Sequence, residues 1–157
     1  LIRPEVVRHR TRLFERYSPP TEAKVLVLLP QTRTKPFHRS KEYRRVLKDI
    51  RQRIGNAIDK IHVCTYAAPF GVIPIELAEV YPLSQHETAT PFDIETITYV
   101  ARQVEKYIET TNYEKIILLQ DAEAWKGKIV AAGRRACKKK QISLTVLRGK
   151  NLGIKLP

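Results

Sequence analysis

A polar loop with several cations follows the first strongly apolar run of the chain. Residues 30–40 read PQTRTKPFHRS and contain Arg33, Lys35, His38 and Arg39 beside hydroxyl and amide side chains such as Gln31. Guanidinium and ammonium groups supply several donors around one anion, so this loop could bind a phosphate or a base edge. His38 could also serve as a general base near neutral pH. A solvated connection with no ligand is the alternative, and the residues alone leave both open.

A second segment, residues 69–82, reads PFGVIPIELAEVYP. Its prolines and single glycine predict a stiff, mostly apolar loop that could form the wall of a site for a flat ring, with Phe70, Gly71 and Tyr81 as base-binding candidates. Glu76 could then pair with a base edge or with a basic side chain. The alternative is a structural loop packed on the core, with its carboxylates in solvent.

A third candidate is a dense basic run that begins after Trp125. It contains Lys128, Arg134 and Arg135 among seven lysines and arginines between residues 126 and 140. Such a run could follow an RNA backbone, and Trp125 could stack on a base. A solvated helix face with a core tryptophan is the alternative.

The overall charge agrees with a polyanionic partner. The 157 residues hold 29 Lys and Arg against 16 Asp and Glu, a net charge of +13, although a basic surface without a specific ligand would look the same. No apolar run approaches a membrane span, and no signal peptide is evident, so we expect a cytoplasmic protein that contacts no membrane. Cys64 and Cys137 lack the spacing and partners of a zinc or redox site, so we expect buried free thiols, no metal and no cofactor.

The elements that would position these segments alternate between strands and helices. Apolar runs predict strands at residues 24–29, 61–67, 115–119 and 142–147, and helical spacing predicts helices over 4–17, 40–58, 90–112 and 122–139. This order favours an α/β fold with a mainly parallel sheet of about four strands. We expect a docking helix and linker over 1–20, one α/β domain over 21–148, and a tail over 149–157. Loops at the carboxyl ends of such strands form sites, so the loops after the first two strands should meet.

Several motifs together resemble one family. RPEVVR at Arg3, RYSPP ending at Pro20, LLP followed by KPF, and above all PFGVIPIELAEVYP at 69–82 are similar to the central, DUF5591-type domain of archaeosine synthase. That archaeal family is related to tRNA-guanine transglycosylases, and the resemblance runs from Arg3 to about Asp121. It implies a three-layer, Rossmann-like domain related in shape to uracil-DNA glycosylases. It also implies an enzyme that adds lysine to the nitrile of 7-cyano-7-deazaguanine in tRNA.

The first loop departs from the family pattern at two reactive positions. That pattern is Pro-Cys, three residues, Lys-Pro-Tyr, then Ser and His. Pro30, Lys35, Pro36 and Ser40 match it, Phe37 replaces Tyr, and Gln31 and Tyr43 stand where Cys and His are expected. The resemblance therefore implies Lys35, Ser40 and Glu76 as the catalytic candidates, whereas amidine formation does not simply carry over. Whether the chain is an enzyme stays open.

Three functions follow from these observations. The first is a tRNA-modification domain that acts on or binds a 7-deazaguanine base in tRNA, alone or with other subunits or domains of a split enzyme. The second is a non-catalytic RNA-binding subunit, favoured by Gln31 and Tyr43. The third, a glycosylase-like base hydrolase, rests on fold analogy alone.

Overall fold

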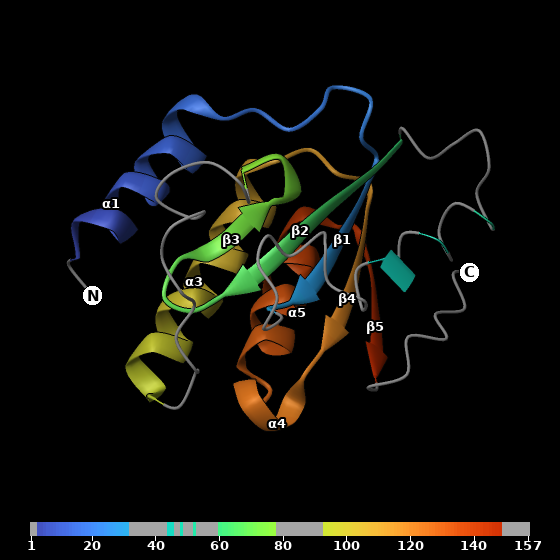
Figure 1. The fold of residues 1–157 in the computed structure, drawn as a ribbon. Coiled ribbons are helices and arrows are strands. Elements are labelled where there is room, and N and C mark those ends of the chain that lie inside the picture. The colour runs from blue at the N-terminus through green and yellow to red at the C-terminus, as the bar shows by residue number, and fades with distance from the viewer. Residues whose placement is uncertain are drawn as a thin grey trace.

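A five-stranded, mainly parallel sheet lies at the centre of the molecule (Figure 1). The structure is a computed structural model that describes residues 3–31, 44–45, 48, 52, 60–77 and 93–148. In these residues the strands are β1 (Val25–Pro30), β2 (Ile61–Ala67), β3 (Gly71–Pro74), β4 (Lys115–Gln120) and β5 (Ser143–Arg148). Their order across the sheet is β3-β2-β1-β4-β5.

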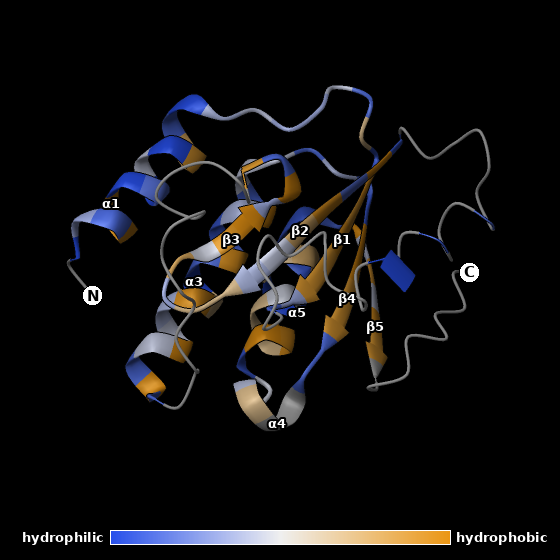
Figure 2. Ribbon diagram, in the orientation of Figure 1, coloured by the Kyte–Doolittle hydropathy of each residue, from blue (hydrophilic) through white to orange (hydrophobic). Residues whose placement is uncertain are grey.

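The centre of the sheet confirms the parallel arrangement expected from the sequence. β1 lies between β2 and β4 and runs parallel to both, with Val25 opposite Ile61 on one side and Lys115 on the other. β5 continues the parallel order beyond β4. The four middle residues of both β1 and β4 are buried, which explains their unbroken apolar sequences, visible as orange arrows in Figure 2.

β3 is the strand that the sequence did not predict. The segment from residue 69 was expected to be a loop, but Gly71–Pro74 pairs antiparallel with β2, from Gly71 opposite Ala67 to Pro74 opposite Cys64. A tight turn with a cis Ala68–Pro69 peptide bond joins the two strands. A four-residue segment that begins with glycine and ends with proline has almost no sequence preference for a strand. Glycine and proline are nevertheless tolerated in an edge strand such as β3.

Two helices cover one face of the sheet. α3 (Ile94–Thr110) and α5 (Lys128–Lys140) pack side by side on it (Figure 1). The core between helices and sheet contains side chains of β1, β2 and β4, such as Leu28, Cys64 and Leu118, with Val104 and Ala132 from the helices. This large apolar contact fixes the helices against the strands.

The opposite face of the sheet contains a second core cluster, to which the N-terminal helix contributes. α1 (Pro4–Thr11) places Val6 against residues of this face that include Val27 and Phe70, and a π-helical turn (Arg12–Arg16) follows it. His9 is fully buried, and its Nε2 donates to the carbonyl of Val72, 2.7 Å away. The N-terminal segment is therefore docked on the sheet, and the α/β class with a mainly parallel sheet is confirmed.

Two helix boundaries differ from the sequence expectation. α3 begins at Ile94 rather than at residue 90, because the carboxylate of Asp93 caps the helix by accepting from the amide of Glu95. Ile94, in the first turn, is 49% exposed. The helix expected over 122–139 is divided into α4 (Ala122–Trp125) and α5, because Lys126 and Gly127 adopt left-handed backbone angles.

The expected core thiols are confirmed, and other expectations fall partly outside the described residues. Cys64 and Cys137 are buried and unbonded. Within the helix expected over 40–58, the described residues 44, 45, 48 and 52 are helical and exposed, whereas the rest, like the expected tail over 149–157, is not described. In the described part of the chain, no helix is long and apolar enough to cross a membrane.

Candidate functional site

The carboxyl ends of β1 and β2 lie side by side, and the residues that follow them contact each other. The amide of Gln31 donates to the carbonyl of Tyr66 at 3.0 Å, and the side-chain Oε1 of Gln31 accepts from the amide of Ala68 at 2.8 Å. The two loops therefore start at one edge, as parallel strands require. The other candidates of the first loop, Arg33, Lys35, His38, Arg39 and Ser40, lie outside the described residues, as does Tyr81.

Phe70 and Gly71 lie within the packed core at the turn from β2 into β3. Phe70 is 1% exposed, and its ring meets the ring of His9 edge to face at a centroid distance of 5.9 Å. Gly71 has a φ of +100°, and a Cβ placed on it would lie 2.8 Å from Cβ of Gln103. Both residues thus serve the packing of α1 and α3 on the sheet in this structure.

Glu76 lies at the opposite edge of the sheet from the one predicted. The antiparallel direction of β3 carries the chain back along β2, so the 3-10 turn Ile75–Leu77 reaches the amino end of the parallel strands. There Glu76 contacts His62, the second residue of β2, at 2.8 and 3.0 Å from its two carboxylate oxygens. Glu76 therefore does not lie at the carboxyl edge, where the loops after the first two strands were expected to meet, because the antiparallel β3 returns the chain to the amino edge.

The contact between Glu76 and His62 belongs to a chain of hydrogen bonds that leads from the partly exposed carboxylate of Glu76 into the core. Nδ1 of His62 lies 2.6 Å from the hydroxyl of Tyr113, which lies 2.8 Å from the hydroxyl of Tyr107, and Cys64 Sγ lies 3.8 Å from that oxygen. One direction of donation satisfies all of these atoms. Cys64 donates to Tyr107, Tyr107 donates to Tyr113, and Tyr113 donates to Nδ1 of His62. Nε2 of His62 then donates to Glu76. This direction requires the neutral imidazole to hold its proton on Nε2.

The carboxylate of Glu76 is the anionic end of this chain. Burial alone raises its pKa, but hydrogen bonds from His62 and from the hydroxyl of Tyr17 together lower the pKa below the ordinary value. Burial, with the nearby carboxylate and thiol, raises the pKa values of Tyr17 and Tyr113 well above the ordinary value. Near neutral pH, Glu76 is therefore a carboxylate, and Tyr17 and Tyr113 keep their hydroxyl protons.

Sequence reasoning missed His62 and its tyrosine partners. His62, Cys64 and Tyr66 alternate along β2 and are all buried, so a histidine inside an apolar strand was the available signal. Tyr17, Tyr107 and Tyr113 come from three separate segments, and only the packing of the linker and α3 against β2 brings them together. Across the described residues, no cluster of three or more His, Cys, Asp or Glu side chains could hold a metal ion.

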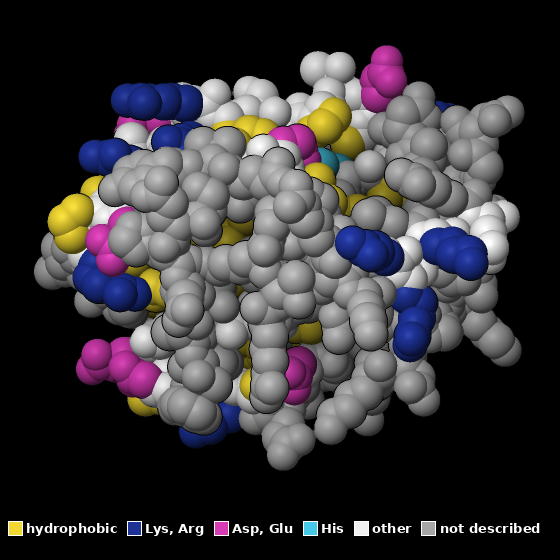
Figure 3. Space-filling model, in the orientation of Figure 1, with side chains coloured by type: hydrophobic (Ala, Val, Ile, Leu, Met, Phe, Trp, Pro, Cys, Tyr) yellow, Lys and Arg dark blue, Asp and Glu magenta, His cyan; other side chains and the backbone are white. Residues whose placement is uncertain are grey.

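The predicted basic surface of α5 is partly neutralised by α3. Arg135 pairs with Glu105 at 3.2 Å and Lys139 with Glu109 at 3.5 Å, all on the surface. Lys128 and Arg134 are exposed. Trp125 is 2% exposed and packs edge to face on Tyr66, which confirms the core alternative for this residue. Lysine and arginine side chains also gather over α1, at the upper left of Figure 3.

Comparisons with known proteins agree with the resemblance seen in the motifs. The chain is 31% identical over 119 residues to the archaeosine synthase subunit alpha of Methanosarcina acetivorans, a match that covers 74% of this chain and 18% of that protein. It is 41% identical over 85 residues to the tRNA-guanine(15) transglycosylase of Pyrobaculum aerophilum, covering 54% of this chain and 15% of the relative. The chain thus spans less than a fifth of the length of these two relatives.

A solved structure and a family model complete the comparison. The crystal structure of AF0587, a protein of unknown function, superimposes with a TM-score of 0.57 at 17% identity, over 82% of this chain and 39% of the other, and shows a shared fold. The model of the family described as "Domain of unknown function (DUF5591)" matches residues 6–152. This chain is thus similar to parts of an archaeosine synthase subunit and of a tRNA-guanine(15) transglycosylase, and it belongs to the DUF5591 family.

Proposed function

We propose that this chain is a tRNA-modification domain that acts in the cytoplasm of an archaeon. It binds a 7-deazaguanine base in tRNA at the carboxyl ends of β1 and β2. The relatives named archaeosine synthase and tRNA-guanine(15) transglycosylase support a tRNA substrate. The observation that supports the location is the hydrogen bond from the amide of Ala68 to Gln31, which holds the residues after β1 and β2 together at one edge of the sheet.

Lys35, Ser40 and Gln31 support binding of the tRNA base rather than chemistry on it. Lys35 would attract the tRNA backbone as a point charge, and Ser40 and Gln31 would offer polar groups to the base. Gln31 stands where the family has a cysteine, and its carboxamide already holds the end of β2. A carboxamide does not add to a nitrile as a thiolate does, so the chain would bind and position the base. Any base chemistry would then need the segments that the relatives possess beyond the matched part.

A titration with matched tRNAs tests this proposal. The tRNA carries either 7-cyano-7-deazaguanine or guanine at the same position, and calorimetry measures both affinities at several salt concentrations. We expect tighter binding of the modified tRNA, and we expect Lys35→Ala to weaken binding and reduce the salt slope by about one phosphate contact. Lys60→Ala is the control, because Lys60 is exposed at the amino edge, before β2. Equal affinity for both tRNAs, or no effect of Lys35→Ala, would contradict the proposal.

The second candidate is a purely RNA-binding subunit, which the engagement of Gln31 favours. Gln31→Cys combined with Tyr43→His restores the two reactive residue types of the family pattern. If the domain retains the catalytic geometry, this variant should gain lysine transfer to the nitrile, measured by mass spectrometry of digested tRNA. No product with unchanged tRNA affinity would favour the RNA-binding subunit over a modification domain.

The basic face of α5 provides a second test of RNA contact. If this face follows the tRNA backbone, Arg134→Ala should weaken binding more than Arg135→Ala, because Arg135 is paired with Glu105. Salt-dependent affinities of both variants measure the difference. Equal and negligible effects would place the tRNA elsewhere on the molecule.

A further inference from the structure

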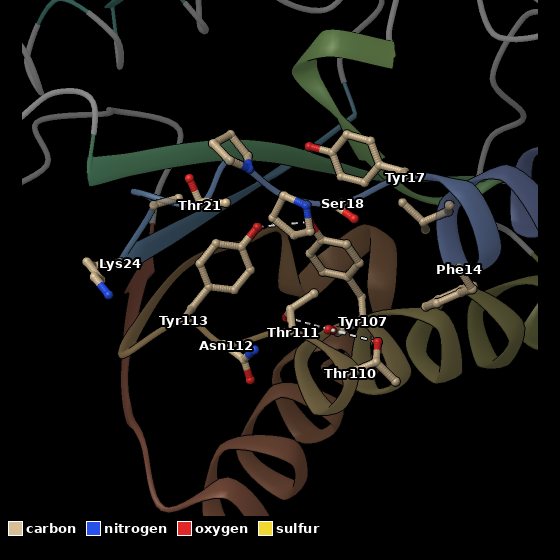
Figure 4. Close-up of a pocket in the computed structure, with 14 residues that line it drawn as sticks. Phe14, Tyr17, Ser18, Thr21, Lys24, Tyr107, Thr110, Thr111, Asn112 and Tyr113 are labelled. Atoms are coloured by element: carbon tan, nitrogen blue, oxygen red, sulfur yellow. Dashed lines mark hydrogen bonds between the residues drawn. The ribbon is translucent and has the colours of Figure 1, made fainter.

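A pocket of about 450 Å³ lies at the amino edge of the sheet, where no function has been assigned. It is bounded by the linker between the N-terminal helical segment and β1 on one side, and by the end of α3 and the turn before β4 on the other. Figure 4 shows Tyr107 and Tyr113 inside it, with Phe14 at one end and Lys24 at the other. Its volume is in the range of sites for small organic molecules.

The hydrogen-bond chain of Glu76 fixes both sides of this pocket. On the linker side, the hydroxyl of Tyr17 donates to Glu76 and lies 3.0 Å from Nε2 of His62. On the other side, Tyr113 is held by Nδ1 of the same imidazole. His62 thus joins the two sides through its two ring nitrogens. A pocket whose walls are held in place loses less entropy when it binds a ligand.

The remaining lining of the pocket combines hydroxyl and amide side chains with the apolar residues Leu13, Pro19, Pro20 and Ala23. Ser18, Thr21 and Asn112 are exposed residues of its rim and offer donors and acceptors at short spacing. Phe14 and Tyr17 are only partly buried, so they present aromatic surface at one end. This combination suits a ligand with several hydroxyl groups and a flat ring.

The charges around the pocket favour an anionic ligand. Lys24 lines one end, Lys106 lies 4.2 Å from the ring centroid of Phe14, and Lys140 donates to the carbonyl of Thr111. Two carboxylates lie near these groups. Glu114 is 3.8 Å from Lys24 in an exposed pair of little energetic weight, and Glu76 accepts from the hydroxyl of Tyr17. Lys24, the lysine that lines the pocket, can therefore act on a phosphate.

We propose that this pocket binds a ribonucleotide, as a second site at the sheet edge opposite the loops of the proposed function. The phosphate lies at Lys24, the ribose hydroxyls meet Ser18, Thr21 and Asn112, and the base lies against Phe14 and Tyr17. The ligand is a free mononucleotide or one nucleotide of an RNA strand, since both present the same groups. Only the RNA-strand source rests on the proposed function.

Calorimetric titration of the whole chain with the four ribonucleoside monophosphates, their 2′-deoxy forms and a short unstructured RNA tests the proposal. We expect binding of at least one monophosphate and a weaker affinity for its deoxy form, because a ribose contact is lost. Lys24→Gln should weaken binding about tenfold, the usual effect of losing one charged hydrogen bond. Lys60→Gln is the matched control, an exposed lysine at the same edge that does not line the pocket.

The arms of the experiment separate the two sources and the two sites. Tighter binding of the RNA than of any monophosphate, with the same loss in Lys24→Gln, identifies an RNA strand as the source; the reverse order identifies a free nucleotide. The monophosphate affinities of Lys24→Gln and Lys60→Gln are measured without tRNA, so a failure of tRNA binding at the carboxyl edge does not affect this result. The proposal is overturned if no monophosphate or RNA binds, or if Lys24→Gln and Lys60→Gln bind equally well while both melt like the parent protein.

Discussion

His62 and Glu76 lie 2.8 Å apart at the amino edge of the sheet, joined across the hairpin of β2 and β3. Because His62 is 3% exposed and bonds at both nitrogens, removing either partner leaves a buried imidazole nitrogen without its hydrogen bond. Tyr113→Phe removes the hydroxyl that bonds both Nδ1 of His62 and the hydroxyl of Tyr107, and leaves these two atoms only their weak contacts with Cys64 Sγ. We expect a loss of about 1–3 kcal/mol in the free energy of unfolding, measured with urea.

Glu76→Gln should be tested beside Glu114→Gln, the matched surface carboxylate. Glu114 pairs with Lys24 in solvent, so its replacement should change stability by less than about 1 kcal/mol. Glu76→Gln should cost more, and its effect should not add to that of Tyr113→Phe, because both residues bond the same imidazole. Additive effects would contradict a connected network.

Gly71 and Gly127 both have positive φ angles, but only Gly71 is crowded, so alanine substitutions at the two positions distinguish backbone strain from steric conflict. A Cβ on Gly127 meets no atom within 4 Å, so Gly127→Ala should cost only the left-handed strain of about 1–2 kcal/mol. At Gly71 the added Cβ also lies 2.8 Å from Cβ of Gln103, which should cost about 1–3 kcal/mol more. Thermal and urea unfolding of the two variants measure the difference. Equal losses would mean that α3 shifts freely away from β3.

His9 should make the fold sensitive to mild acid. Burial lowers its pKa to about 4 from the ordinary 6.5, with Arg12 adding to the effect and the bond to Val72 opposing it. The unfolded chain therefore takes up this proton first as pH falls, and stability is complete above pH 6.5 and decreases between 6.5 and about 4. The total loss is up to about 3 kcal/mol.

His9→Gln provides the check on this pH dependence. The glutamine amide can donate to the carbonyl of Val72 as Nε2 of His9 does, but it does not titrate. Urea unfolding across this pH window should show a shallower decrease for the variant. An unchanged slope would assign the acid sensitivity to other groups.

Both thiols should be unreactive in the folded protein. Burial raises the pKa of Cys64 and of Cys137, and the thiolate is the reactive form. A disulfide reagent that releases a coloured thiolate should therefore react slowly in buffer and quickly with both cysteines in urea. Fast reaction of one thiol in buffer would reveal an opening of α5 or of β2 from the core.

The sequence by itself determined the fold class, the central strands and the family. The apolar runs of β1, β2 and β4 are buried on both faces, and strands of this kind separated by helices have almost no arrangement other than a parallel sheet. The loop motifs identified the family, because they depend on residue types and spacing rather than on contacts. The sequence also predicted that the segments after β1 and β2 start at the same edge of the sheet, because the two strands run parallel.

Only the tertiary structure decided where the second segment leads. A four-residue strand with Gly71 and Pro74 carries too little local preference to be predicted, and it forms because β2 offers a free edge. That pairing reverses the chain, buries Phe70 and moves Glu76 to the far edge, beside His62. The partners Tyr17, Tyr107 and Tyr113 meet there through packing between distant segments, and no local pattern encodes such contacts.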